Sequence, residues 1–152
     1  MFPPSSEFPH TPISICHVAT GDLWAGAEVQ LKILLSRLVG RANIQLSAIL
    51  FNEGRLEKEI EGLGICVKVF PETRWSSGKI FCELVREFKR SPAGVVHTHK
   101  YKDTILAAPA SKLCGIRHVV RTVHGLSEPF KGLQAFKMNV YEMMERTVHR
   151  CC

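Results

Sequence analysis

Short apolar runs alternate with stretches of helical periodicity along most of this 152-residue chain. The first run, residues 13–19, leads into a turn with two glycines and then into apolar residues at helical spacing over 27–39. The same pair of patterns recurs four more times. Strands separated by helices cannot pair as tight hairpins, so this alternation predicts a parallel sheet with helices on both faces.

The predicted fold class is therefore α/β, with a doubly wound, Rossmann-like parallel sheet. Right-handed crossovers favour the strand order 3-2-1-4-5, which places the topological switch point between the first and fourth strands. Pro109 lies inside one predicted helix and predicts a kink or a split there. The expected strands are residues 13–19, 44–51, 65–70, 94–98 and 117–123, and the expected helices are residues 27–39, 54–63, 78–90, 103–114 and 133–150, with Gly40, Gly64 and Gly115 as stops.

The chain divides into a short lead-in and one domain. Residues 1–12 hold four of the eight prolines and are expected to be disordered, while residues 13–152 form the Rossmann-like domain. We find no signal-peptide pattern and no apolar run of about 18 residues. The six cysteines show no C-x-x-C spacing, which favours a reducing compartment. We expect a cytoplasmic protein, with peripheral contact to the inner face of the membrane as an alternative.

The formal net charge of +6 suggests an anionic partner, such as a phosphorylated small molecule, an acidic lipid headgroup or a nucleic acid. Nucleic acid is the weakest of the three. The longest basic run is Lys89-Arg90, and no basic stripe is interleaved with aromatic residues.

Histidines gather where two predicted strands end. His97 and His99 lie at the end of the fourth strand, and His124 follows the fifth. Ligands of open α/β sheets bind at the carboxyl ends of strands, so these residues are site candidates. The three imidazoles suggest a metal site, but Asp103 is the single carboxylate nearby, and we expect none. Hydrogen bonding or acid–base chemistry on a hydroxyl substrate, or plain packing, are the alternatives. His17, in mid-strand, is interpreted as a core histidine.

The turn after the first strand, Gly21 to Glu28, is a second candidate. Its glycines allow the amides at a helix start to approach a phosphate. The turn is neither G-x-G-x-x-G nor a P-loop. The alternative is a plain tight turn in which Glu28 complements the helix dipole. Lys100, Lys102 and Arg121 flank the same edge, either to hold anionic groups or as solvated surface charges.

Four short motifs, in this order, resemble the N-terminal half of a GT-B glycosyltransferase of the retaining, family-four kind. The resemblance covers roughly residues 13–150. It implies that Ala25 and Gly26 approach the donor diphosphate, that His124 is the catalytic residue beside the transferred sugar, and that the acceptor is bound by His97, His99, Lys100 and Gly125. The motifs are Ile15-Cys16-His17-Val18, Trp24-Ala25-Gly26-Ala27-Glu28, Val95-Val96-His97-Thr98-His99 and Thr122-Val123-His124-Gly125.

The function implied by the resemblance is transfer of a sugar from a nucleotide-sugar donor to a hydroxyl of a saccharide or lipid-linked acceptor, as in polysaccharide biosynthesis, without a cofactor. The second domain of that family has no counterpart in this sequence, so we expect the chain to be an acceptor-binding half that is inactive alone. Two alternatives stay open: a non-catalytic subunit of a split glycosyltransferase, and a metal-dependent hydrolase based on the three histidines.

Overall fold

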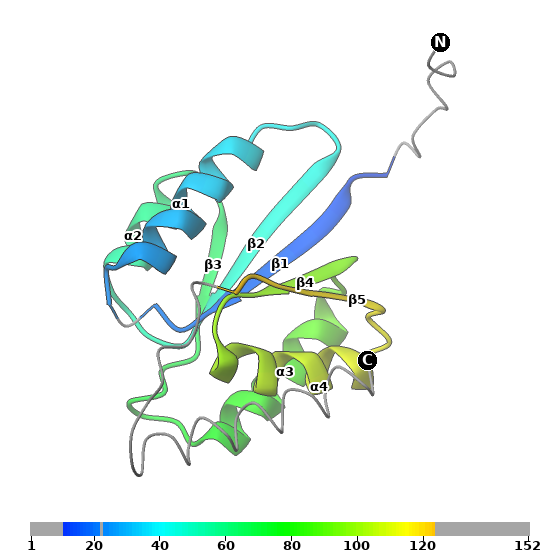
Figure 1. Ribbon diagram of the computed structural model, residues 1–152. Coiled ribbons are helices and arrows are strands. Elements are labelled where there is room, and N and C mark those ends of the chain that lie inside the picture. Colours follow the sequence, from blue (N-terminus) through cyan, green and yellow to red (C-terminus); the bar gives the residue numbers. More distant parts are fainter. Residues whose placement is uncertain (1–10, 22, 124–152) are drawn as a thin grey trace.

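The computed structural model describes residues 11–21 and 23–123, in which strands and helices alternate as the sequence predicts (Figure 1). His124, Gly125, the expected helix over 133–150 and most of the lead-in lie outside the described residues. The elements are β1 (Ile13–Ala19), α1 (Gly26–Leu38), β2 (Ile44–Leu50), α2 (Arg55–Glu61), β3 (Cys66–Val69), α3 (Ser77–Arg90), β4 (Val95–Thr98), α4 (Tyr101–Leu113) and β5 (His118–Arg121).

The described strands form one sheet in the order β3-β2-β1-β4-β5, and every pair is parallel. The predicted order and fold class are confirmed. β1 is the central strand, because it pairs along its length with β2 and, over its middle residues Ile15 to Val18, with β4. The direction of winding reverses between β1 and β4, so the switch point lies where it was predicted.

Helices cover both faces of the sheet, with α1 and α2 on one side and α3 and α4 on the other (Figure 1). Each side has its own apolar core. β1 contributes to both, since Val18 belongs to the core under α3 and α4, and the next residue, Ala19, belongs to the core under α1 and α2. This two-sided burial explains why the strand is apolar almost throughout rather than alternating with polar residues.

The end of α4 shows why its stop was predictable. Gly115 has a φ of +75°, a left-handed conformation that glycine adopts without steric cost. Its N–H donates to Lys112 O at 3.1 Å, and the N–H of Ile116 donates to Ser111 O at 3.0 Å. These two bonds form a Schellman motif, which satisfies the last carbonyls of the helix.

Of the two outcomes expected at Pro109, the split does not occur, because α4 runs without a break from Tyr101 to Leu113, and the kink stays a prediction. The neighbours of the proline in the helix, Ala108 and Ala110, are at most 1% exposed. Packing of this helix face against the sheet compensates for the backbone donor that proline lacks. None of the described helices is long and apolar enough to cross a lipid bilayer.

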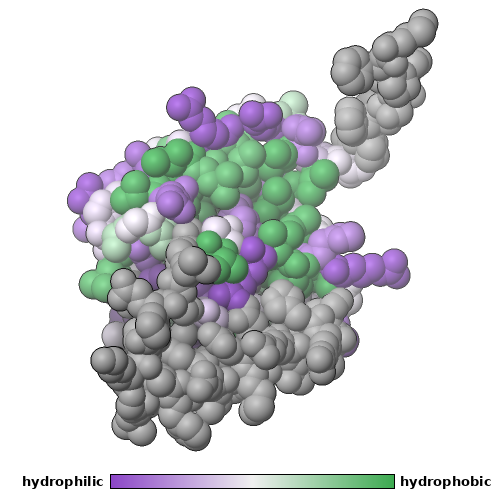
Figure 2. Space-filling model, viewed as in Figure 1, coloured by the Kyte–Doolittle hydropathy of each residue, from purple (hydrophilic) through white to green (hydrophobic). Residues whose placement is uncertain are grey.

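Apolar residues also gather on the outer surface, over α1 and the neighbouring strands in the view of Figure 2. The exposed large apolar side chains include Ile33 of α1, at 51% exposure, and Ile13 of β1, at 52%. A continuous apolar region at a surface is typical of a face that contacts another domain or protein.

The core under α3 gives a direct test of this packing. Phe88 is 1% exposed, so Phe88→Ala should lower the free energy of unfolding by about 3–5 kcal/mol. Leu113→Ala is the matched control, because Leu113 is 66% exposed and its truncation should cost about 0.5 kcal/mol or less. Urea denaturation followed by circular dichroism measures both values. Equal small losses would contradict the assignment of Phe88 to the core.

Candidate functional site

The C-terminal ends of β1, β4 and β5 meet at one edge of the sheet, and polar residues follow each of them. Thr20 follows β1, His99 and Lys100 follow β4, and Thr122 follows β5. The backbone N–H of Thr122 donates to Thr98 O at 3.0 Å, so the pairing of β4 and β5 continues up to this edge. The segments that follow these three strands therefore share one edge of the sheet.

Asp103 is the central group of this edge, and its side chain is fully buried. The hydroxyl of Thr20 donates to Asp103 Oδ1 at 2.6 Å, and the backbone N–H of Lys100 donates to Oδ2 at 2.9 Å. Asp103 is the third residue of α4, where a carboxylate caps the free amides of the helix start. One carboxylate thus joins the end of β1 to the start of α4.

Burial raises the pKa of Asp103 from 3.8 to about 7. The hydrogen bond from Thr20 and the charge of Lys100 act in the opposite direction, because both favour the ionised carboxylate. A carboxyl group with a pKa near neutrality changes its protonation state at physiological pH. Such perturbed groups are typical of functional sites.

Glu28 holds the start of α1 in the same way. Its side chain is 4% exposed, and its Oε2 accepts a hydrogen bond from the backbone N–H of Ala25 at 3.3 Å. Its Oε1 lies 2.7 Å from the ammonium group of Lys100. This ion pair links the N-terminus of α1 to that of α4 across the switch point. Glu28 therefore caps and complements the helix dipole, as one of the two interpretations of this turn predicted.

The turn between β1 and α1 leaves open space at Gly26, the first residue of the helix. A Cβ atom added to Gly26 would meet no atom within 4 Å. Trp24 anchors the turn, because the guanidinium of Arg55 stacks 4.3 Å from its ring centre. Ala25 is the exposed N-cap residue of α1. Whether this turn binds a diphosphate stays a prediction.

The three cations expected at the edge each have a partner. Lys100 pairs with Glu28, Lys102 pairs with Glu72, and the guanidinium of Arg121 stacks 4.3 Å from the ring centre of Tyr101. Their role toward an anionic ligand stays a prediction. Each is fixed in position by its own contact.

The histidines are grouped differently from the sequence prediction, because His17 joins His97 and His99. His17 Nδ1 lies 3.2 Å from His99 Nε2, and the rings of His97 and His99 lie 4.4 Å apart. His17 is 1% exposed and His99 is 4% exposed. Burial, reinforced by His97, lowers the pKa of His17 to about 3. His17 is thus a neutral core histidine, as expected, but also a member of this cluster.

Sequence reasoning did not foresee the roles of Thr20, Asp103 or His17 at this edge. One signal was available for the carboxylate, since an acidic residue three positions after a helix N-cap is a capping pattern. Both Ala25 with Glu28 and Lys100 with Asp103 have this spacing. No local sequence pattern predicts the hydrogen bond between Thr20 and Asp103, which are 83 residues apart.

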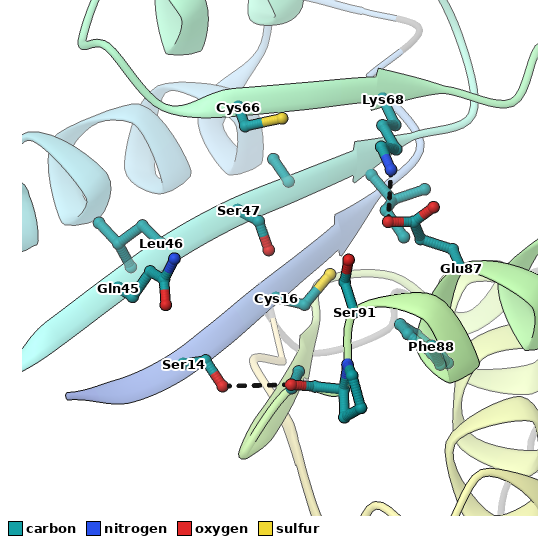
Figure 3. Close-up of a pocket in the computed structure, with 14 residues that line it drawn as sticks. Ser14, Cys16, Gln45, Leu46, Ser47, Cys66, Lys68, Glu87, Phe88 and Ser91 are labelled. Carbon is teal, nitrogen blue, oxygen red and sulfur yellow. Dashed lines mark hydrogen bonds and ion pairs between the residues drawn. The ribbon is translucent and has the colours of Figure 1, made fainter. Parts of the chain in front are cut away.

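A separate hollow of about 370 Å³ lies between α3 and residues of β1, β2 and β3 (Figure 3). Its charged lining residues, Lys68 and Glu87, form an ion pair in which each compensates the charge of the other. Burial raises the pKa of its Cys16 thiol to about 11, so this thiol stays protonated and is a poor nucleophile. The hollow therefore lacks an activated group, and the edge of the sheet is the stronger candidate.

Comparisons with known proteins identify the fold. No protein-family model and no curated protein matches the chain. Among solved structures, Anabaena HepE in complex with UDP has a TM-score of 0.67 at 20% identity, over 87% of this chain and 35% of that chain. A UDP-N-acetylglucosamine 2-epimerase has a TM-score of 0.63 at 15% identity, over 91% of this chain and 39% of that one.

The lipopolysaccharide outer core galactosyltransferase WaaB, in its apo form, has a TM-score of 0.55 at 13% identity, over 72% of this chain and 32% of that chain. At these identities the likeness shows a GT-B-like, Rossmann-like fold and no more. The chain spans about a third of the length of these proteins.

The raised pKa of Asp103 predicts how stability depends on pH. Between pH 3.8 and about 7 the folded protein keeps a proton that the unfolded chain has released, so this group stabilises the fold at low pH. That contribution is lost as the pH rises through 7. Asp103→Asn cannot titrate, so the stability of the native chain relative to this variant should fall by about 1 kcal/mol or more from acid to neutral pH.

Urea titrations at several pH values measure this difference, and Glu61→Gln, at an exposed carboxylate, controls for the loss of a carboxyl group. A difference between the native chain and Asp103→Asn that stays constant with pH would contradict the raised pKa. It would mean that Thr20 and Lys100 hold the carboxylate ionised.

Proposed function

We propose that this chain is the N-terminal, acceptor-binding lobe of a retaining glycosyltransferase of the family-four kind. The reaction moves a sugar from a nucleotide-sugar donor to a hydroxyl of a saccharide or lipid-linked acceptor. The observation that carries the proposal is the open start of α1 at Gly26, located at the switch point between β1 and β4. Ligands of open α/β sheets bind at this position.

The start of α1 suits a diphosphate for two physical reasons. The first amides of a helix have no partner within the helix and carry a partial positive charge, which favours an anion. Glu28 would repel that anion, but its charge is compensated by the Lys100 ammonium at 2.7 Å. The backbone at Ala25 and Gly26 would therefore meet the diphosphate without an uncompensated carboxylate beside it, with the Gly26 N–H as the donor, because the Ala25 N–H already donates to Glu28 Oε2 at 3.3 Å.

The acceptor side of the proposed site consists of His97, His99, Lys100 and Gly125, with His124 beside the transferred sugar. His97 Nε2 forms a hydrogen bond of 2.8 Å with the hydroxyl of Thr122, two residues before His124. This contact supports a common location for the two segments. In a front-face mechanism the departing phosphate takes the acceptor proton, so His124 acts by positioning and by stabilising the transition state.

A second lobe would supply the rest of the donor site. Support comes from the lengths of the similar structures, of which this chain spans about a third. HepE was solved with UDP and glucose, and WaaB is described as a galactosyltransferase. We propose that the present chain alone transfers little or no sugar, because one lobe provides only one side of the grip on the donor.

The variant Gly26→Val tests the proposed donor site. Its side chain enters open space, so the fold should tolerate it, but it would fill the place assigned to the diphosphate. We expect kcat/KM for transfer by the native gene product to fall by about tenfold or more. The assay measures release of UDP from a panel of UDP-sugars with a saccharide acceptor mixture.

Gly78→Val is the matched control, because Gly78 also lies in the first turn of a helix and also faces open space. Its activity should stay at the native level. Full activity of Gly26→Val would contradict the diphosphate site. Epimerisation of the sugar nucleotide without transfer would contradict the proposed reaction and favour the chemistry of the epimerase with the similar fold.

A further inference from the structure

We propose that His17, His97 and His99 form a binding site for one divalent transition-metal ion of the zinc class. This site goes beyond the proposed transferase function and does not depend on it. Register brings the three residues together: His17 on β1 pairs with His97 on β4, and paired residues of neighbouring parallel strands point to the same face. His99 follows His97 by two positions, which returns its side chain to that face.

The distances suit a shared ion. One nitrogen from each histidine lies within 4.8 Å of the others, and the closest pair, His17 Nδ1 and His99 Nε2, is 3.2 Å apart. In a tetrahedral zinc site with Zn–N bonds of 2.0–2.1 Å, ligand nitrogens are separated by about 3.3 Å. One pair is therefore already at this separation, and small side-chain rotations bring the third nitrogen to it.

Hydrogen bonding explains the cluster less well than a metal does. His17 Nε2 is buried and has no hydrogen-bond partner among the described residues. Either assignment of the proton between His17 and His99 leaves this nitrogen unsatisfied, which is costly in a buried site. Three imidazoles in contact also place several lone pairs close together. A cation that accepts those lone pairs gives the cluster a favourable arrangement.

Two contacts orient the ligands from outside. The hydrogen bond between His97 Nε2 and Thr122 Oγ1, at 2.8 Å, fixes the orientation of the His97 ring. The cap at the start of α4 fixes the backbone beside His99, because Asp103 accepts the N–H of Lys100 at 2.9 Å. A structural or catalytic zinc site shows this kind of support around its ligands.

The chemistry of the donors selects the ion. Three imidazole nitrogens suit Zn²⁺, Co²⁺, Ni²⁺ or Cu²⁺, whereas Mg²⁺ and Ca²⁺ prefer oxygen ligands. His97 is only partly buried, and a tetrahedral site with three histidine ligands would take a water molecule or an anion as its fourth ligand. An ion here would connect the ends of β1 and β4 and add positive charge at the edge of the sheet.

The test titrates Zn²⁺ into the 152-residue chain, prepared without a histidine tag and stripped with a chelator. We expect one ion to bind with a dissociation constant of about 10 µM or lower, and the melting temperature to rise with the Zn²⁺ concentration. His97→Ala removes the least buried ligand and should weaken binding by about tenfold or more. His118→Ala is the matched control, since His118 is exposed on β5 outside the cluster, and should bind as the native chain does.

Co²⁺ gives a readout that does not depend on a variant folding correctly. One equivalent bound to the native chain should produce the visible absorption of a four-coordinate site with nitrogen ligands. The proposal is overturned if neither ion binds with one-to-one stoichiometry, or if His97→Ala, with a native circular dichroism spectrum, binds Zn²⁺ as tightly as the native chain.

Discussion

The arrangement of the C-terminal ends of β1 and β4 depends on the hydrogen bonds that the buried carboxyl group of Asp103 accepts. The carboxyl group accepts a hydrogen bond from the hydroxyl of Thr20, just after β1, and another from the backbone N–H of Lys100, at the start of α4. Lys100, positioned in this way, reaches Glu28 at the start of α1. Two helix starts and two strand ends are thus connected through one chain of polar contacts. Since these groups are largely withdrawn from water, their hydrogen bonds gain strength and would be costly to break.

This chain of contacts defines what the edge can do. Lys100, Lys102 and Arg121 each contact another side chain of the fold, so their charged groups are positioned before any ligand binds. Such a surface fits a lobe that orients a substrate while another part of the protein supplies further contacts. The histidine cluster lies beside it on the same strands, and a metal there would add a fixed positive charge to an edge that otherwise relies on Lys100. The two proposals share His97 and His99, whereas Ala25 and Gly26 belong to the proposed diphosphate site alone and His17 to the proposed metal site alone.

The sequence predicted the fold well because its signals are local. Apolar runs predicted the strands, and Gly115 predicted the end of α4. The right-handedness of crossover connections predicted the strand order. It failed where distant residues decide the outcome. Pro109 does not break α4, since packing against the sheet outweighs the local rule. The pairing of His17 with His97 depends on register between β1 and β4, which periodicity alone does not determine.

The most direct test of the central claim, that the edge between β1 and β4 binds a nucleotide diphosphate, is a titration of the ¹⁵N-labelled chain with UDP, followed by amide chemical shifts. The account predicts weak binding, with a dissociation constant on the order of 1 mM, since one lobe grips the ligand from one side. The shifts should be concentrated at Ala25, Gly26 and Lys100. Shifts centred on Ser14 and Gln45, in the hollow beside α3, or no shifts at saturating UDP, would contradict it.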